Sequence, residues 1–223
     1  MSPWLARRWY DFGYWVSFLS FTFGYSLRVI GRRNLPKSGP ALLLSNHQSF
    51  LDPVIVGVAS HRYLTYLGRD SLFRNRYLGA LIESLNAIKI DRDFGKEGLR
   101  STLDALDHGR AVLMFPEGER SHDGEMHPFK PGVSLLVKRL KAPIVPVGIA
   151  GAFGALSRFM KTPKFAPLFL APNEATIAVS VGAPIDPMPL VAMKREEMLQ
   201  RLHDVVKVEF EKAKRLRRQM RGK

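Results

Sequence analysis

Cysteine is absent from the 223-residue chain. This absence excludes a disulfide framework, a thiolate nucleophile and a cysteine-ligated metal, and it fits a reducing compartment. The six histidines show neither H-x-H nor H-E-x-x-H spacing, so we expect no metal site. With 46% hydrophobic and 24% charged residues, the composition is that of a globular protein long enough for one full core.

Acidic residues are also in short supply. The chain has 20 Asp and Glu against 34 Lys and Arg, which gives a net charge of +14. Such a charge favours anionic partners, among them nucleic acid, anionic lipid head groups and phosphorylated small molecules. A nucleic-acid-binding protein would carry a basic aromatic sheet or a recognised motif. The sequence has neither, so we expect no nucleic acid among the partners.

Charge is nearly missing from Trp9–Leu27, whose only charged residue is Asp11. Nine residues of this segment are aromatic, and Trp and Tyr favour the membrane–water interface. The length would just span a bilayer, but the aromatic density and Asp11 favour an interfacial or re-entrant helix. The segment lacks an A-x-A-like site, so it is not expected to be a signal peptide. The alternative is an amphipathic helix buried in a soluble core.

After a linker at residues 31–40, short apolar runs alternate with stretches of helical spacing. This alternation predicts a single α/β domain with a mixed β-sheet flanked by helices. One segment, Ser157–Pro172, is rich in proline and aromatic residues and resists assignment. The predicted strands are Ala41–Ser45, Tyr63–Leu67, Ala87–Ile90, Ala111–Phe115, Ile144–Ile149 and Thr176–Val181. The predicted helices are Asp52–Ala59, Leu72–Leu85, Lys96–His108, Val133–Leu140 and Lys194–Arg218.

The first block that could carry chemistry is Asn46–Pro53, in which His47 follows a predicted strand and Asp52 begins a predicted helix. Five residues on one helix rotate by about 140°, so His47 must lie in the loop to reach Asp52. A neutral imidazole can deprotonate a hydroxyl near pH 7, and a carboxylate on the other ring nitrogen fixes its tautomer. The chain has no G-x-S-x-G, so the substrate's own hydroxyl could be the nucleophile. The alternative is that Asp52 only caps the helix, or forms a capping box with Ser49.

The second block is Phe115–Ser121, with the sequence FPEGERS, at the end of a predicted buried strand. Ligands of α/β proteins bind at the carboxyl ends of the strands. Gly118 allows close backbone approach, and the planar guanidinium of Arg120 suits a phosphate. The alternative is an ordinary polar turn.

Two further blocks, Ala87–Arg92 (AIKIDR) and Val145–Ile149 (VPVGI), are each more typical of structure than of a site. In this order, however, the four blocks resemble the 1-acylglycerol-3-phosphate acyltransferase (PlsC-like) family of glycerolipid acyltransferases. Members of that family carry an N-H-x4-D block, a block ending in I-D-R, an F-P-E-G-x-R-S block and a V-P-V block. The resemblance runs from about residue 42 to residue 149.

The resemblance implies an α/β acyltransferase that acts at a membrane face without a metal or a bound cofactor. It would move a fatty acyl chain from acyl-CoA or acyl-ACP to the hydroxyl of a lysophospholipid, with 1-acylglycerol-3-phosphate giving phosphatidic acid. His47 would be the general base and Asp52 its partner, and residues 145–149 would border the acyl channel. The residues that would shape the phosphate site of the acceptor are Arg92, Glu117, Gly118, Arg120 and Lys130.

Two positions depart from the family pattern. Glu119 replaces the usual threonine, and a carboxylate beside a phosphate site repels the ligand unless it is paired or turned away. An acceptor without phosphate, such as an aminolipid or water, therefore remains an alternative. Asn86 and Ala87 stand where a glycine is common before I-D-R, so the backbone near Arg92 could differ. The third interpretation, a non-catalytic basic membrane-binding module, is disfavoured by the intact pair of His47 and Asp52.

These observations together predict a membrane-associated protein at the cytoplasmic face. Residues 1–30 would form an N-terminal membrane-associated segment, and residues 31–223 an acyltransferase domain with a basic C-terminal helix. The expected partners are the acyl thioester, the lysophospholipid, a membrane containing anionic lipid and, for one of the two donors, acyl carrier protein. The basic tail could bind anionic lipid, or it could simply be a solvated helix face.

Overall fold

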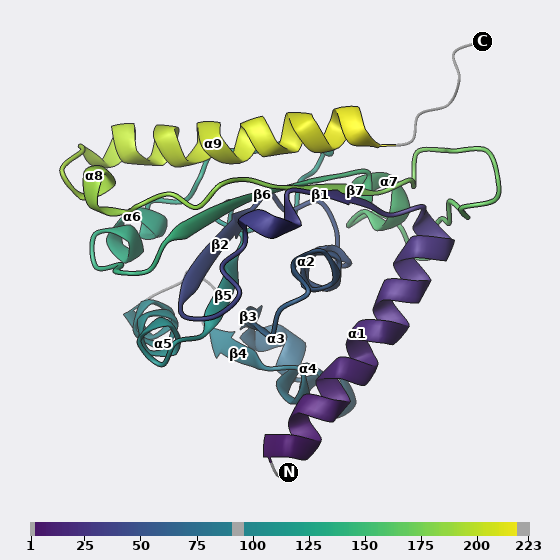
Figure 1. Ribbon diagram of the computed structural model, residues 1–223, viewed down its shortest axis with the longest axis horizontal. Coiled ribbons are helices and arrows are strands. Elements are labelled where there is room, and N and C mark those ends of the chain that lie inside the picture. The colour runs from purple at the N-terminus through teal and green to yellow at the C-terminus, as the bar shows by residue number, and fades with distance from the viewer. Residues whose placement is uncertain (1–2, 91–95, 218–223) are drawn as a thin grey trace.

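The computed structural model describes residues 3–90 and 96–217. Its centre is a seven-stranded sheet with the order β1-β7-β6-β2-β5-β3-β4 (Figure 1). Neighbouring strands are parallel except for β6 and β7, which are antiparallel. The mixed sheet predicted from the sequence is therefore confirmed. The strands are β1 (Arg28–Ile30), β2 (Ala41–Ser45), β3 (Leu64–Arg69), β4 (Ala87–Ile90), β5 (Ala111–Met114), β6 (Ile144–Ala150) and β7 (Ala178–Val181).

Helices cover both faces of the sheet. One layer contains α5, α6, α8 and α9, and the other contains α1, α2 and α7 (Figure 1). The helices are α1 (Pro3–Tyr25), α2 (Asp52–Ser60), α3 (Asp70–Phe73), α4 (Arg76–Ser84), α5 (Lys96–Asp107), α6 (Gly132–Val137), α7 (Ala152–Leu156), α8 (Met188–Val191) and α9 (Arg195–Leu216), with a 3-10 turn, η1 (Arg32–Asn34).

Strand β2 shows why the central strands are apolar throughout. Leu42 and Leu44 pack with α5, α6 and α9, whereas Ala41 and Leu43 pack with α1 and α2 on the other side. Successive side chains of a strand point to opposite faces, and here both faces are buried. The continuous run ALLLS is therefore the sequence of a strand between two helical layers, as predicted.

Helix α9 lies directly on β6, and a glycine makes the close approach possible. A Cβ atom on Gly148 would lie 2.1 Å from the backbone nitrogen of Phe210, so only glycine fits there. The buried carboxylate of Glu209 accepts hydrogen bonds from Ser180 Oγ at 2.5 Å and Lys212 Nζ at 2.7 Å. This pairing satisfies the one acidic side chain that α9 buries among the described residues.

The structure differs from the sequence-based expectations at a few points. The single helix expected over residues 72–85 is two helices, because the side chain of Asn75 caps α4 by accepting the N–H groups of Tyr77 and Leu78. Strand β1 was not predicted, because three residues are too few to show alternation. It pairs with β7, so the sheet begins within the stretch assigned to the N-terminal segment. Residues 157–175 contain no helix or strand.

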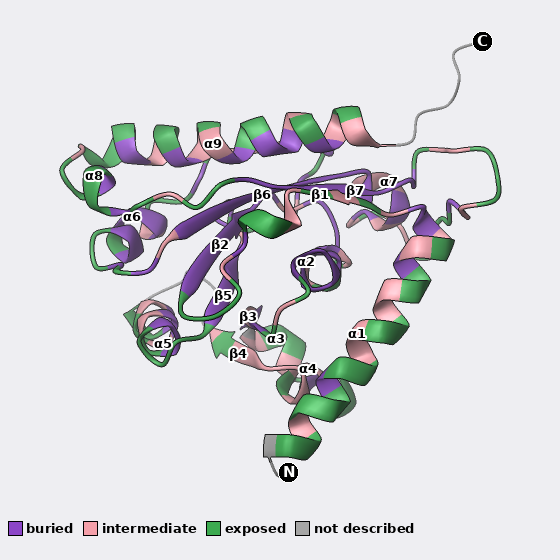
Figure 2. Ribbon diagram, viewed as in Figure 1, coloured by how far each residue is buried: buried purple, intermediate pink, exposed green. Residues whose placement is uncertain are grey.

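Helix α1 is apolar on two sides. Its inner side buries Tyr10, Phe21 and Tyr25 against the domain. Its outer side is exposed along the whole helix (Figure 2). The large apolar side chains on that outer side are Trp4, Leu5, Trp9, Phe12, Trp15, Val16, Leu19 and Phe23. Among the helices described here, none combines the length and the apolarity needed to cross a bilayer.

Candidate active site

The first and second blocks meet where the parallel strands β2 and β5 end. His47 lies in the loop between β2 and α2, and Glu117–Ser121 lie in the loop that follows β5. The backbone N–H of Ser121 donates to the carbonyl of His47 at 2.7 Å, so the two loops are directly bonded. The candidate site therefore lies at the carboxyl edge of the sheet, where α/β proteins bind ligands.

The imidazole of His47 faces the carboxylate of Asp52, with 2.8 Å between Nδ1 and Oδ2. Asp52 is fully buried, whereas the side chain of His47 is 18% exposed. A proton on Nδ1 is donated to the carboxylate, which leaves the lone pair of the ring on Nε2. The geometry gives the arrangement predicted for the pair, with His47 in the loop and Asp52 at the start of α2.

Asp52 also organises the loop before α2, but it does not cap the helix itself: the N-cap is Leu51, without a side-chain cap bond. Oδ2 of Asp52 accepts the backbone N–H groups of Gln48 at 2.5 Å and Ser49 at 2.7 Å. The hydroxyl of Ser49 accepts the N–H of Leu51 at 3.1 Å rather than that of Asp52, so only one half of a capping box is formed. One carboxylate thus fixes both the backbone that carries His47 and the ring of His47 itself.

Phe115 restricts the imidazole from its face. The two rings are stacked, with 4.0 Å between their centroids and 15° between their planes. Because the ring of His47 is bonded at Nδ1 and covered on one face, it has little rotational freedom. Because the imidazole is already held in place, little conformational entropy is lost when a substrate hydroxyl binds.

Glu117 does not point at a ligand site. Its side chain is 2% exposed, and its two oxygens accept the backbone N–H groups of His47 at 2.9 Å and His127 at 3.1 Å. Burial raises the pKa of Glu117 to about 7, and the nearby charges of Asp52 and Asp123 add to the rise, against the two backbone bonds. In these contacts, the Glu117 carboxyl group connects the two loops rather than reaching out to an acceptor.

Gly118 and Lys130, both predicted at the phosphate site, lie against each other. Gly118 has a φ of +76°, which favours glycine, and a Cβ there would lie 3.0 Å from Cγ of Lys130. The backbone N–H of Lys130 donates to the carbonyl of Pro116 at 2.8 Å. The aliphatic stem of Lys130 therefore crosses the Gly118 turn, and Lys130 as a whole is exposed to solvent.

Arg120 lies beside the same loop as His47. Its guanidinium carbon stacks 3.3 Å from the ring centroid of Phe50, which is itself 52% exposed. A cation held over an aromatic face keeps its charge and loses conformational freedom. Phe50 is three residues after His47, so this contact sets a fixed cation next to the imidazole loop.

The carboxylate of Glu119 is paired. Arg158 donates to Oε2 of Glu119 at 3.3 Å, and Nε2 of His122 lies 3.5 Å from the same oxygen. The hydrogen bond from Arg158 keeps the pKa of Glu119 below its ordinary value, so this carboxyl group is ionised near neutral pH. Arg158 also donates to the carbonyl of Arg120 at 3.2 Å. The repulsion expected from Glu119 is therefore opposed by a neighbouring cation.

Arg92, the remaining predicted cation, lies outside the described residues. The backbone just before it can be described, and Asn86 has a φ of +72° where the family commonly has glycine. Asn tolerates this left-handed conformation better than other side chains. Its amide donates to the carbonyl of Leu64 and, at 2.7 Å, to Oγ1 of Thr65. The sequence departure at Asn86 is thus compatible with the turn.

The apolar block Val145–Ile149 forms most of β6 and is completely buried. Asn46, the residue before His47, joins this strand to the site. Its side chain donates to the carbonyl of Ile149 at 2.9 Å and accepts the N–H of Ile149 at 2.7 Å. The proposed role of this block in lining an acyl channel stays a prediction.

Sequence reasoning missed Arg158, Phe50 and Phe115 as contributors to this region. Arg158 comes from the segment that resisted assignment and is 38 residues from Arg120, so no local spacing could reveal it.

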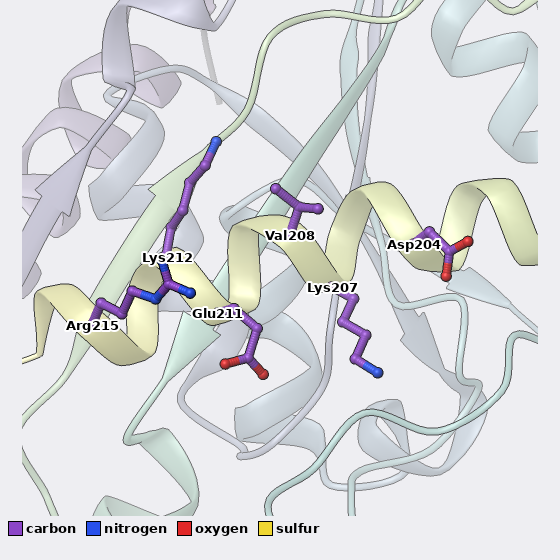
Figure 3. Close-up of a pocket in the computed structure, with 6 residues that line it drawn as sticks. All are labelled: Asp204, Lys207, Val208, Glu211, Lys212 and Arg215. Carbon is purple, nitrogen blue, oxygen red and sulfur yellow. The ribbon is translucent and has the colours of Figure 1, made fainter.

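The depression in Figure 3, about 460 Å³ in volume, is lined entirely by α9 and by none of the candidate site residues. The side chains that line it point in different directions from the helix (Figure 3). They are Asp204, Lys207, Val208, Glu211, Lys212 and Arg215.

Comparison with known proteins identifies the family. The sequence model of the family described as Acyltransferase matches residues 26–150, which is more than half of the chain. The chain belongs to the acyltransferase family. The matched region contains all four blocks from which the resemblance was drawn, so the family predicted from them is confirmed.

Individual relatives agree with this assignment. The chain is 27% identical over 137 residues to the 1-acyl-sn-glycerol-3-phosphate acyltransferase of Bacillus subtilis, which covers 60% of this chain and 68% of that protein. It is 29% identical over 141 residues to a chloroplastic enzyme of the same name from Brassica napus, covering 61% of this chain but only 40% of that protein. The acyltransferase thus spans from two fifths to about two thirds of the length of these curated relatives.

The fold is shared with a solved structure. The crystal structure of PlsC from Thermotoga maritima, a 1-acyl-sn-glycerophosphate acyltransferase, matches with a TM-score of 0.74 and 23% identity. The match covers 94% of this acyltransferase and 79% of that chain. It includes the mixed sheet and the helices that cover it.

Proposed function

We propose that this acyltransferase moves a fatty acyl chain from acyl-CoA or acyl-ACP to the free hydroxyl of a lysophospholipid at a membrane surface. The acceptor we propose is 1-acylglycerol-3-phosphate, so that the product is phosphatidic acid. The observation that carries the proposal is the 2.8 Å contact between Nδ1 of His47 and Oδ2 of Asp52. The relatives are named for 1-acyl-sn-glycerol-3-phosphate, which supports the choice of acceptor.

The chemistry begins at Nε2 of His47. This nitrogen takes the proton of the acceptor hydroxyl as its oxygen attacks the carbonyl carbon of the thioester. Asp52 stabilises the imidazolium that forms and keeps the ring in one tautomer. When the tetrahedral intermediate collapses, the carbon–sulfur bond breaks, and the proton on Nε2 passes to the departing thiolate. The products are an ester and a thiol, and His47 is neutral again.

Two cations of the stretch between β5 and α6 suit a phosphate-bearing acceptor. Arg120 is held over Phe50, and Lys130 crosses the Gly118 turn. Each charge-assisted hydrogen bond to a phosphate oxygen contributes roughly 1.5–3 kcal/mol. Because Glu119 is paired with Arg158, the sequence argument for a phosphate-free acceptor loses its main support.

The outer side of α1 supports the membrane surface as the place of action. Exposed side chains along the helix include Trp4 at 67%, Phe12 at 60% and Trp15 at 55%. An apolar surface made of eight large exposed side chains on one helix is rarely left in water. Trp is also a typical residue of the membrane interface. We propose that α1 lies in the interface with this side toward the lipid, at the cytoplasmic face, where the net charge of +14 attracts anionic head groups.

The experiment is an acyl-transfer assay with the purified full-length protein in mixed micelles. Radiolabelled acyl-CoA or acyl-ACP is supplied with lysophosphatidic acid, a neutral monoacylglycerol or a lyso-aminolipid. We expect lysophosphatidic acid to be the best acceptor, and we expect labelled phosphatidic acid to form with at least one of the two donors. If no acceptor is acylated, the catalytic proposal fails. If a phosphate-free acceptor is preferred, only the acceptor assignment fails.

A further inference from the structure

The segment Ser157–Leu170, of which the proposed function uses only Arg158, exposes large apolar side chains. Phe169 is 82% exposed, Phe159 67%, Leu170 62% and Phe165 55%. The segment has no helix or strand that would give these side chains a regular apolar face to pack. Exposed aromatic residues gathered in one segment indicate a surface that contacts a partner or a membrane.

One end of this segment is bonded to the end of α1. The N–H of Ala166 donates to the carbonyl of Gly24 at 2.8 Å, and the N–H of Leu168 donates to the carbonyl of Phe23 at 2.9 Å. Oγ of Ser26 returns a hydrogen bond to the carbonyl of Ala166 at 2.8 Å. In Figure 1 the green loop accordingly lies beside the C-terminal end of α1. The segment is therefore fixed to the helix rather than hanging from the domain.

Aromatic contacts continue the apolar surface of α1 onto the segment. The rings of Phe23 and Phe169 are stacked with 6.0 Å between their centroids, and those of Tyr25 and Phe165 lie 5.3 Å apart. Phe23 is itself one of the exposed side chains on the outer side of α1. The outer side of α1 and the tip of the segment consequently form one apolar face.

The other end of the segment lies at the candidate active site. Arg158 is bonded to Glu119 and to the backbone of Arg120, and its neighbour Phe159 is exposed next to His122. Lys161, between these two ends, is also exposed. The segment thus extends from the rim of the site to α1, with aromatic and cationic side chains along it.

We propose that Ser157–Leu170 is a second membrane-contacting element, which inserts Phe169 and Leu170 into a bilayer containing anionic lipid beside α1. This proposal rests on the proposed membrane-surface function and extends it to a part of the chain that no motif includes. Aromatic rings enter the interface, and Lys161 pairs with anionic head groups. Because the same segment borders the site, its insertion brings the rim of the site to the level at which a lysophospholipid presents its head group.

A lipid surface fits this face better than a second protein chain does. The exposed rings continue the outer side of α1, whose exposed aromatic side chains lie along the length of the helix. An exposed cation on the segment and a strongly positive chain complement anionic head groups. Self-association through this face would be seen as a change of mass in the absence of lipid.

The chain offers a sharp test because it has no cysteine and because all three of its tryptophans, Trp4, Trp9 and Trp15, lie in α1. A single Phe169→Cys substitution in the full-length protein takes a nitroxide spin label at one site. The control is Met188→Cys in α8, which is 68% exposed and lies at the opposite end of the molecule in Figure 1. The vesicles consist of phosphatidylethanolamine and phosphatidylglycerol.

With vesicles, the label at position 169 should become accessible to oxygen and protected from a water-soluble nickel chelate, whereas the label at 188 should not change. Brominated lipid, which quenches the tryptophans, reports independently on α1. If the tryptophans are quenched while position 169 stays in water, the second element is wrong and the proposed membrane function stands. If neither responds, both fail. A dimer that protects position 169 without lipid would also overturn the proposal.

Affinity provides a second measurement. The double substitution Phe169→Ser with Leu170→Ser should lower the vesicle partition coefficient at least about 10-fold. Acyl transfer in detergent micelles, where the bilayer is absent, should change less than about 2-fold by the same reasoning. The matched control Met188→Ser should leave both quantities unchanged. Unaltered partitioning of the double variant would contradict the proposal.

Discussion

The buried carboxyl group of Glu117 accepts the backbone N–H of His47 at 2.9 Å. This bond joins the loop that carries the proposed base to the loop that carries the proposed phosphate cations. The second oxygen of Glu117 accepts the N–H of His127, so neither oxygen is directed at a ligand in the structure. In the F-P-E-G block, Glu117 therefore holds the backbone of the site in place, whereas neighbouring residues border the site.

The first prediction concerns the stability of the fold as a function of pH. The pKa of Glu117 is raised from 4.5 to about 7, so the folded state binds a proton there more tightly than the unfolded state does. The stabilisation is fully present below pH 4.5 and is lost as the pH rises through about 7. The free energy of unfolding of the wild type, relative to Glu117→Gln, should therefore increase by about 3 kcal/mol between pH 8 and pH 4.5. Urea unfolding of both proteins at several pH values measures this, and a pH-independent difference would contradict it.

The second prediction separates a positioning role of Glu117 from acceptor binding. In Glu117→Gln, an amide NH2 replaces one of the two acceptors, so one backbone N–H loses its partner and the His47 loop shifts. We expect kcat to fall about 10-fold, the effect of one buried hydrogen bond, while KM for lysophosphatidic acid changes less than 2-fold. Steady-state kinetics in micelles measures both constants. A raised KM at unchanged kcat would instead support direct contact with the acceptor.

The third prediction tests the proposed base. His47→Ala should lower kcat at least about 100-fold, the scale of a lost general base. Asp52→Asn should cost a comparable or somewhat smaller factor, because it removes the charge that stabilises the imidazolium. Asp52 also binds the N–H groups of Gln48 and Ser49, so its variant needs a thermal unfolding measurement as a control. Near-full activity of a folded His47→Ala protein would exclude the mechanism.

Most of the sheet could be predicted from the sequence because its strands are buried on both faces. The run at Ala41–Ser45 needs no alternation to be recognised as a strand, and Ala87–Ile90 was predicted with the bounds that the structure has. Strand β1 could not be predicted, because Arg28–Ile30 is a strand only through its pairing with β7. A local sequence pattern predicts a strand that is apolar along its own length. It misses a strand such as β1, which is defined by its pairing with a distant segment, as Arg28 pairs with Ala178.

The candidate site shows the same division. The spacing of His47 and Asp52 predicted their contact, since both lie within one loop and one helix start. The pairing of Glu119 with Arg158 could not be predicted, because it joins residues 39 positions apart through a segment without regular structure. The sequence likewise could not show that Glu117 faces the backbone rather than the ligand, because both roles require the same carboxyl group.

The fourth prediction concerns the outer side of α1. Phe12→Gln with Leu19→Gln changes two exposed side chains, 60% and 49% exposed, and should move the protein from the membrane fraction to the soluble fraction. The fold should persist, because neither side chain is buried. Tyr10→Ala is the matched control: Tyr10 is buried and bonded to the hydroxyl of Tyr66 and the carbonyl of Arg62, so this change should destabilise the protein instead. Fractionation and thermal unfolding distinguish the two outcomes, and unchanged membrane binding of the double variant would contradict the prediction.

The last prediction concerns the phosphate of the acceptor and the role of Glu119. Arg120→Ala should raise KM for lysophosphatidic acid about 10-fold or more, the loss of one charge-assisted bond, and leave KM for a neutral monoacylglycerol nearly unchanged. Glu119→Thr should change KM less than about 2-fold, because Arg158 already offsets its charge. In an Arg158→Ala background the carboxylate of Glu119 is no longer offset, so the same Glu119→Thr change should lower KM for lysophosphatidic acid. A double-mutant cycle over these two positions measures the coupling with both acceptors. Strict additivity would show that the pair does not protect the phosphate site, and an equal response of both acceptors to Arg120→Ala would show that Arg120 does not bind the phosphate.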